Sequence, residues 1–296
     1  MLSECHGHIM MDGISYQASV SRHGGGVCEA AIRENFDALR SRGITYFRDG
    51  GDALGVSERA AAIAPEYGIT YSTPVFAIHR KGHYGSIVGR SYDSAAQYRE
   101  LLKEAASRGA CFVKLMLSGL IDFTNFGRVT GEPLGAEEIR TLVHIAHEEG
   151  FRVMAHVNGA DPVRDALEAG VDSIEHGCYI DREGLDILKE KRAVWVPTIA
   201  AIAAFTARGD FPGGVTRQIL STQLQAVCEA FSKGVLVASG SDSGAVGVKH
   251  GRGLENELAL LRAAGGSRAA VIIGRANAAL RRRFRGRQPR RPGACS

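Results

Sequence analysis

The sequence of 296 residues lacks an apolar run of membrane-spanning length, and no basic stretch followed by an apolar one stands near its start. We therefore expect no contact with a membrane and a location in the cytoplasm. No Cys-x-x-Cys motif occurs, and the six cysteines are scattered along the chain. This spacing predicts reduced thiols and not a disulfide framework.

Acidic residues are absent after Glu257, whereas nine arginines lie between Arg268 and the C-terminus. Without these nine arginines the chain has 27 basic and 32 acidic residues, so its formal net charge of +4 comes from this segment alone. We therefore expect no nucleic-acid binding by the folded body. Three explanations for the arginine-rich end stay open: a disordered basic tail, a shifted reading frame and a tail that binds RNA.

One pattern repeats along the chain: a helix-like segment, a glycine turn and an apolar stretch that ends in a polar residue. Glycine directly after a helix is the usual left-handed C-cap, and continuous apolar strands indicate a parallel sheet buried on both faces. The expected helices cover residues 27–42, 54–67, 94–108, 136–149, 162–169, 182–191 and 216–233. The expected strands cover the stretch before His8 and residues 44–47, 69–78, 111–116, 151–156, 171–176, 193–197 and 235–239.

Strands and helices that alternate eight times over about 250 residues are typical of an α/β fold of the (β/α)8 TIM-like barrel type. The alternative is a doubly wound open sheet, whose first strand is usually followed by a glycine-rich phosphate turn. The first strand of this chain ends in His6-Gly7-His8 instead. We therefore favour the barrel.

Polar residues stand at the carboxyl ends of the expected strands, where the active sites of such barrels lie. His6 and His8 are two residues apart on one strand, so their side chains are expected to share a face. The other strand ends carry Lys114, His156, His176 and, just after the last strand, Asp242. Each residue alone has an ordinary explanation, such as a solvated histidine or a helix cap. Their joint placement predicts one metal centre, because neutral imidazole is a good zinc ligand.

With its neighbouring motifs, this ordered set resembles the amidohydrolase superfamily of metal-dependent hydrolases. The resemblance covers about residues 3–264 and is greatest to the branch of imidazolonepropionase-like proteins and cytoplasmic Xaa-Pro dipeptidases. The motifs that carry it are His6-Gly7-His8, Arg48-Asp49-Gly50-Gly51, the segment 114–119, Ala155-His156, the segment 173–177, the segment 240–244 and His250-Gly251.

Members of the superfamily usually carry a small β-sandwich beside the barrel. Only five residues precede His6, and the arginine-rich end does not resemble the family's final segment. We therefore expect a chain truncated at both ends, with the accessory β-sandwich largely missing. The expected domains are a hydrolase barrel at 1–265 and an arginine-rich segment at 266–296 that is partly helical or disordered. An exposed apolar patch in place of the sandwich would lead to low solubility or to a homo-oligomer.

The resemblance implies two divalent metal ions, with zinc as the expected metal. His6, His8 and Asp242 would bind the more buried ion, and His156 and His176 the more exposed one. Lys114 would be carboxylated by CO2 and bridge both ions, because a carbamate is an anionic oxygen ligand whereas an ammonium cannot bind a cation.

By the same resemblance the protein would cleave an amide C–N bond of a small substrate, such as a dipeptide or an N-acyl amino acid, with metal-bound hydroxide as nucleophile. Asp242 would be the catalytic residue that moves the proton from water to the leaving amine. His83, Arg80 and Tyr179, in loops after the third and sixth strands, are the candidate substrate contacts.

Two other functions stay open. One is a cyclic-amide hydrolase or deaminase-like member with a single metal ion, which would not need a carboxylated Lys114. The other is a non-catalytic barrel, which the presence of all six candidate ligands disfavours.

Overall fold

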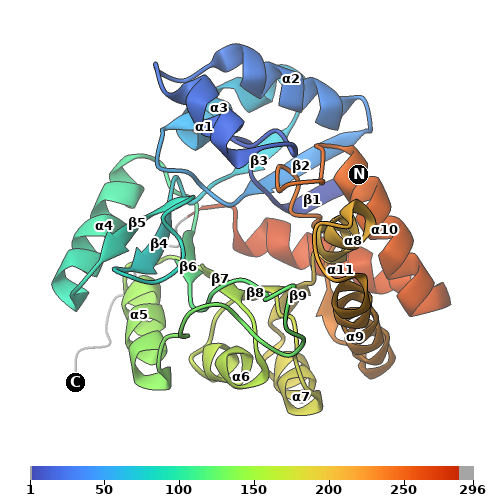
Figure 1. The fold of residues 1–296 in the computed structure, drawn as a ribbon. Coiled ribbons are helices and arrows are strands. Elements are labelled where there is room, and N and C mark those ends of the chain that lie inside the picture. The colour runs from blue at the N-terminus through green and yellow to red at the C-terminus, as the bar shows by residue number, and fades with distance from the viewer. Residues whose placement is uncertain (1, 287–296) are drawn as a thin grey trace.

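The computed structural model describes residues 2–286, and in Figure 1 helices surround a ring of parallel strands. The strands are β1 (Leu2–Gly7), β2 (Ile44–Asp49), β3 (Thr70–Ser72), β4 (Ala77–Arg80), β5 (Gly89–Tyr92), β6 (Val113–Met116), β7 (Val153–Val157), β8 (Ser173–His176), β9 (Val194–Val196) and β10 (Leu236–Val237). The α-helices are α1 (Tyr16–His23), α2 (Glu29–Arg40), α3 (Val56–Ile63), α4 (Ala95–Ser107), α5 (Ala136–Glu148), α6 (Ala160–Glu168), α7 (Arg182–Lys191), α8 (Ile199–Arg208), α9 (Gly213–Lys233), α10 (Arg252–Gly265) and α11 (Ala269–Arg283). Two short 3-10 helices are η1 (Ala64–Tyr67) and η2 (Gly266–Arg268).

The strands form two parallel hydrogen-bonded groups, ordered β1-β2-β3 and β10-β9-β8-β7-β6-β4-β5. Further backbone hydrogen bonds close the ring. Cys5 N donates to Ser239 O at 2.9 Å, which joins β1 to the segment after β10, and Cys111 N donates to Thr73 O at 2.8 Å, which joins the end of β3 to the start of β6. The expected (β/α)8 barrel is thereby confirmed.

The third expected strand, residues 69–78, is interrupted in the structure. It forms β3 and β4, which are separated by a turn that contains Pro74 and Val75. Proline offers no N–H to a strand ladder, and Val75 has a φ of 69°, which extended backbone does not allow. The turn makes room for β5, a strand beside β4 that the sequence pattern did not predict.

Helix α5 illustrates how the outer layer forms. Its buried side chains recur every three or four residues and include Ile139, Val143 and Ala146. Acidic residues occupy its first turn, where they are favoured by the helix dipole, and Gly150 follows its end with a φ of 80°. The apolar stripe therefore packs on the strands while the polar face meets water.

Helix α11 closes the amino end of the barrel. Ala276, Leu280 and Phe284 join an interior cluster that includes Cys5 and Met154 from the strands. In Figure 1 this helix, drawn in red, crosses the ring of strands. The last residues of the expected arginine-rich segment, 287–296, lie outside the described part of the chain.

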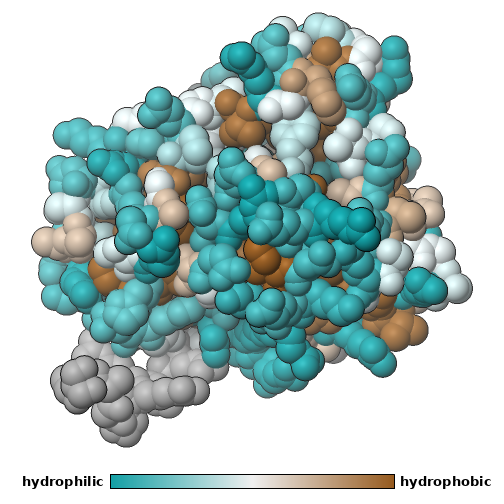
Figure 2. Space-filling view, turned by 90° about the horizontal axis from the view of Figure 1, so that it is seen from below, coloured by the Kyte–Doolittle hydropathy of each residue, from teal (hydrophilic) through white to brown (hydrophobic). Residues whose placement is uncertain are grey.

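The surface mixes polar and apolar side chains. On the face shown in Figure 2, brown apolar groups are separated by teal polar ones and form no continuous patch. None of the described helices combines the length and apolar character that a membrane span requires. Every strand within residues 2–286 belongs to the barrel or pairs with it, so these residues hold no separate β-sandwich.

Candidate metal centre

Three predicted ligands meet at the carboxyl end of the barrel. Nitrogen atoms of His6 and His8 and a carboxylate oxygen of Asp242 all lie within 4.8 Å of one another. Asp242 Oδ1 is 3.5 Å from His6 Nε2 and 3.6 Å from His8 Nε2. The three donors are thus arranged around one point.

The backbone of β1 produces this arrangement. Asp242 N donates to His6 O at 2.9 Å, and His8 N donates to Ser243 O at 2.7 Å. The pairing of β1 with β2 shifts register between Glu4 and Gly7, so the two histidines do not lie in a regular strand as the sequence pattern suggests. Asp242 itself has a φ of 61°, in the left-handed region.

Glycine is required beside both histidines. A Cβ at Gly7 would lie 2.5 Å from Ser243 Oγ and 2.7 Å from the Phe47 ring. A Cβ at Gly50 would lie 2.1 Å from the ring of His8. Both separations are far below van der Waals contact, so the side chains around His8 pack only because these two positions have none.

Lys114 completes the group from β6. Its Nζ is 3.4 Å from Nε2 of His6 and 3.4 Å from Nε2 of His8, and the side chain is buried. Around a tetrahedral zinc ion with bonds of 2.0–2.1 Å, neighbouring ligand atoms are about 3.4 Å apart. The distances from Asp242 Oδ1 to Nε2 of His6 and to Nε2 of His8 therefore suit such an ion.

A buried ion pair orients His6. Its Nδ1 is 2.6 Å from Glu175 Oε2, while Glu175 Oε1 accepts hydrogen bonds from Arg48 Nη2 at 2.7 Å and from Ser173 Oγ at 2.5 Å. Arg48 is a permanent cation, so Glu175 is an anion and His6 Nδ1 is the donor. His6 Nε2 therefore carries the free lone pair that faces Lys114 and Asp242, which is the arrangement common among metal-binding histidines.

His156 and His176 lie beside the first group. The ring of His176 is centred 4.9 Å from that of His6 and 4.6 Å from that of His156. His176 Nδ1 is 2.7 Å from Thr198 Oγ1, and His156 Nε2 donates to Gly119 O at 3.1 Å. One nitrogen of each ring, Nε2 of His176 and Nδ1 of His156, is therefore available to bind a metal ion.

Burial sets the protonation of these groups. Loss of hydration, reinforced by neighbouring positive groups, lowers the pKa of His6, His8 and His176 well below the usual value and that of His156 to about 3. Burial likewise lowers the pKa of Lys114. All four imidazoles are therefore neutral near pH 7, the form that binds metal ions.

The predicted substrate contacts are less closely grouped. Arg80 is exposed and forms an ion pair with Glu138 of α5, so the structure does not bring it to the metal centre. His83 Nδ1 donates to Glu132 O at 3.1 Å, and the Tyr179 hydroxyl accepts from Gly127 N at 3.0 Å. These last two side chains hold the loop between β6 and α5.

The sequence analysis overlooked the residue next to His83. The ring of Tyr84 is centred 5.2 Å from that of His156, and burial together with the charge of Asp242 raises the pKa of its hydroxyl. It included Arg48 and Glu175 in the motifs of the resemblance without giving them a role, and it did not mention Thr198. Charged residues inside otherwise apolar strands were the available signal, because they are rarely buried unless they are paired.

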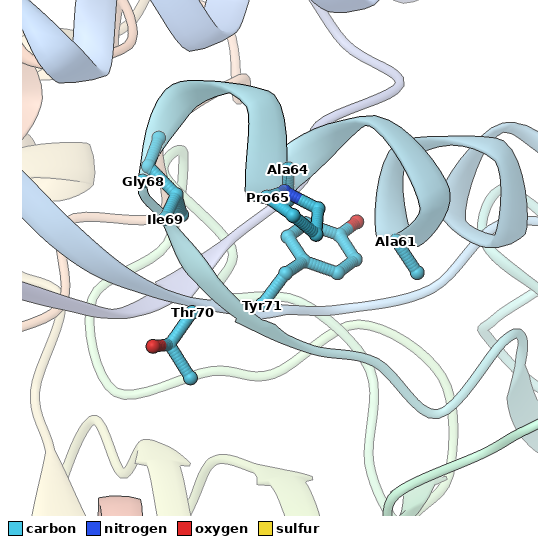
Figure 3. Close-up of a pocket in the computed structure, with 7 residues that line it drawn as sticks. All are labelled: Ala61, Ala64, Pro65, Gly68, Ile69, Thr70 and Tyr71. Carbon is cyan, nitrogen blue, oxygen red and sulfur yellow. The ribbon is translucent and has the colours of Figure 1, made fainter.

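A separate pocket of about 390 Å³ lies at the amino end of β3. Figure 3 shows the Tyr71 ring beneath the helical segment that carries Ala61, Ala64 and Pro65. Its lining has no histidine, cysteine or carboxylate, so it offers neither metal ligands nor a general base.

Comparison with known proteins places the chain in a family. The model of the amidohydrolase family matches residues 4–292, beyond residue 264, where the resemblance of the motifs was expected to end. Ochratoxinase of Aspergillus niger is 29% identical over 175 residues, which are 55% of this chain and 35% of that protein. An uncharacterised protein of Mycobacterium tuberculosis is 29% identical over 182 residues, which are 58% of this chain and 47% of that protein. The matched segments thus span less than half of these relatives.

Solved structures share the fold. A Xaa-Pro dipeptidase with bound methionine superposes with a TM-score of 0.72 at 21% identity, covering 95% of this chain and 75% of that one. The A. niger ochratoxinase superposes with a TM-score of 0.73 at 23% identity, covering 92% and 68%. At these identities the likeness concerns the fold alone.

Proposed function

The chain belongs to the amidohydrolase family, and on that basis we propose that it is a metal-dependent hydrolase that cleaves the amide C–N bond of a small substrate. The observation that carries the proposal is the convergence of His6, His8, Asp242 and Lys114 on one point. The relatives named for ochratoxin hydrolysis and for dipeptide cleavage support an amide substrate such as a dipeptide or an N-acyl amino acid.

His6, His8 and Asp242 would hold one divalent cation, with zinc as the expected metal, and His156 with His176 would hold a second. Such cations polarise a carbonyl oxygen and make water a stronger nucleophile near neutral pH. Arg48 and Glu175 would keep Nε2 of His6 directed at its cation. The free nitrogens of the four histidines, which are neutral, suit this role.

Asp242 would move the proton. Burial raises the pKa of this carboxyl to about 6, which Lys114 opposes and Glu175 reinforces. A bound cation would lower this pKa, but the carboxylate oxygen that does not bind the cation can still accept a proton from water. Asp242 would accept the proton of the attacking water and donate it to the nitrogen of the leaving amine.

Lys114 would be carboxylated. Its lowered pKa increases the fraction of neutral amine. The lone pair of Nζ would form a bond to the carbon of CO2. The nitrogen would then lose one proton to solvent, which gives an anionic carbamate with two oxygen ligands.

Lys114→Ala should weaken metal binding, and short carboxylic acids should partly restore activity. Lys114→Arg should not be rescued, because its cation stays in the site. Equal activity of Lys114→Ala and the parent without added acid would refute the carbamate.

His83 and Tyr179 would contact the substrate from the loops at the mouth. Arg80 would reach a substrate carboxylate only after releasing Glu138. The cytoplasmic location and a homo-oligomeric state stay predictions.

A second candidate is a hydrolase of cyclic amides, or a deaminase-like enzyme, with one metal ion. It is favoured by the observation that, among the described residues, the donors within 4.8 Å of one another are those of His6, His8 and Asp242, without His156 and His176.

Metal analysis and a substrate screen distinguish these candidates. We would load the metal-depleted protein with zinc, manganese or cobalt, count bound ions by elemental analysis, and assay dipeptides, N-acyl amino acids and lactams. Two ions and turnover of a linear amide support the first candidate, whereas one ion and turnover of a lactam support the second. If no amide, ester or lactam is hydrolysed with any of the metals, the chain is a non-catalytic barrel.

A further inference from the structure

His176 does not follow the geometry of its strand. Its neighbour Glu175 points into the barrel, where it contacts His6 and Arg48. In a regular strand the next side chain would point outward to the helices. His176 instead has a φ of 66°, and the following Gly177 has a φ of 58°. This left-handed turn brings the imidazole of His176 beside His6 and His156.

The turn directs the backbone carbonyl of His176 toward two side-chain donors. Trp195 Nε1 donates to His176 O at 3.0 Å, and Gln223 Nε2 donates to the same oxygen at 2.8 Å. A non-glycine residue with positive φ is uncommon and persists only where its surroundings hold it. The hydrogen bonds from Trp195 and Gln223 hold His176 in this conformation.

Gln223 is a polar residue on the buried face of its helix. It lies on the buried face of α9, one turn after Ile219 and one turn before Val227, and is 1% exposed. An amide in such a position costs free energy unless it is hydrogen-bonded, and its Oε1 has no hydrogen-bond partner among residues 2–286. A leucine or methionine would fill the position without that cost, so the N–H donors are what this residue contributes.

The amide of Gln223 joins two strand ends. Besides His176 O at the end of β8, it donates to Pro197 O, after β9, at 3.2 Å. Thr198, the next residue, has a φ of 47°, and its hydroxyl is 2.7 Å from His176 Nδ1. One amide therefore fixes both segments whose side chains form the His176–Thr198 pair.

We propose that Gln223, assisted by Trp195, is a positioning residue that holds His176 in its left-handed conformation and so completes the second half of the metal centre. The proposal rests on the proposed function only for the identity of what His176 binds. The conformation itself is a property of the protein alone.

The test uses Gln223→Met, which keeps the length of the side chain and removes its donors. Gln225→Met, at an exposed position of the same helix, is the matched control. Zinc would be titrated calorimetrically into the metal-depleted full chain of the parent and both variants, and crystal structures of all three would report the φ of His176. Circular dichroism would check folding, and Trp195→Phe would replace Gln223→Met if the latter does not fold.

We expect Gln223→Met to retain the binding of one zinc ion and to bind the second about 10–100-fold more weakly, the usual effect of losing a residue that orients a metal ligand. The Gln225→Met control should match the parent. Parent-like affinities together with an unchanged His176 in Gln223→Met would overturn the proposal. If the parent binds no zinc, zinc is not the metal of this site, and the φ of His176 in the variant alone decides the positioning role.

Discussion

The two halves of the metal centre are held in different ways. In the first half, His6 is oriented by a fully buried ion pair, since Glu175 and Arg48 are both 0% exposed. In the second half, His176 is oriented by a neutral threonine hydroxyl and by a left-handed backbone. Charge holds one half, and backbone conformation holds the other.

This difference shows where the site is rigid. A charge-assisted hydrogen bond is roughly twice as strong as a neutral one, and breaking a buried ion pair leaves an uncompensated charge. The guanidinium of Arg48 also lies 4.6 Å above the ring of Phe284, beyond the end of α11. The first half is thus tied to the barrel's closed end, whereas the second depends on local hydrogen bonds between β8, β9 and α9.

The largest expected effect comes from the first half. Asp242→Asn keeps the size of the side chain but removes the proton acceptor and weakens a metal ligand. We expect the rate on a confirmed amide substrate to fall by at least about 10²–10⁴-fold, the usual value of general acid–base catalysis. Steady-state kinetics measure the rate, and circular dichroism checks the fold. A variant as fast as the parent would rule out Asp242 as the proton carrier.

The ion pair between Glu175 and Arg48 should contribute most to the stability of the first half. Glu175→Gln leaves the charge of Arg48 buried without a countercharge, so we expect the free energy of unfolding to fall by about 3–5 kcal/mol. Urea unfolding of the metal-depleted protein measures it. Glu183→Gln, at an exposed carboxylate of α7, is the control and should change stability by less than about 0.5 kcal/mol. Equal stabilities of the two variants would contradict the role given to charge in the first half.

The second half contains a buried carboxyl of its own, Glu257 of α10, which accepts a hydrogen bond from Ala200 N at 2.7 Å beside Thr198. No arginine or lysine pairs with it among the described residues, and burial raises its pKa to about 8, opposed by hydrogen bonds from Ala200 and Ile199 and reinforced by Glu4 and Asp242. Because the pKa is higher in the folded state, its contribution to stability is present below about pH 4.5 and is lost as the pH rises through 8.

Glu257→Gln should remove the loss of stability that ionisation of Glu257 causes as the pH rises. Relative to the parent, we expect the variant to gain a few kcal/mol of stability between about pH 5 and pH 9. Urea unfolding at both pH values gives the difference. A difference that does not change with pH would mean that Glu257 is ionised in the folded protein at both values.

The smallest expected effect is that of Thr198→Val. Valine keeps the β-branched shape, and therefore the strain at a φ of 47°, while the hydrogen bond to His176 is lost. We expect a loss of about 1 kcal/mol in the free energy of unfolding, the usual net value of a neutral hydrogen bond. Urea unfolding of Thr198→Val and Glu175→Gln under the same conditions compares the two halves of the metal centre. If both variants lose the same free energy of unfolding, the two halves are held equally strongly and the distinction between them is wrong.

Much of the barrel follows from local pattern. Residues 182–191 were expected as a helix and form α7 with those bounds, because apolar spacing and the turn that follows are encoded within a few residues. The same reasoning led to the six candidate ligands, although only His6, His156 and His176 lie at the carboxyl ends of strands, whereas Lys114 is the second residue of β6 and Asp242 lies in the loop after β10. It failed at residues 69–78, where a proline and a left-handed valine interrupt an apolar run that otherwise suits one strand.

The sequence by itself determined which polar residues stand at the ends of which strands, since helix and strand periods are local properties of the chain. Only the tertiary structure decided how these side chains are aimed. Arg48 and Glu175 are 127 residues apart and His176 and Gln223 are 47 apart, so no local period relates them. Their contacts exist because closing the barrel buries these groups together, and a buried charge or carbonyl must find a partner wherever the chain provides one.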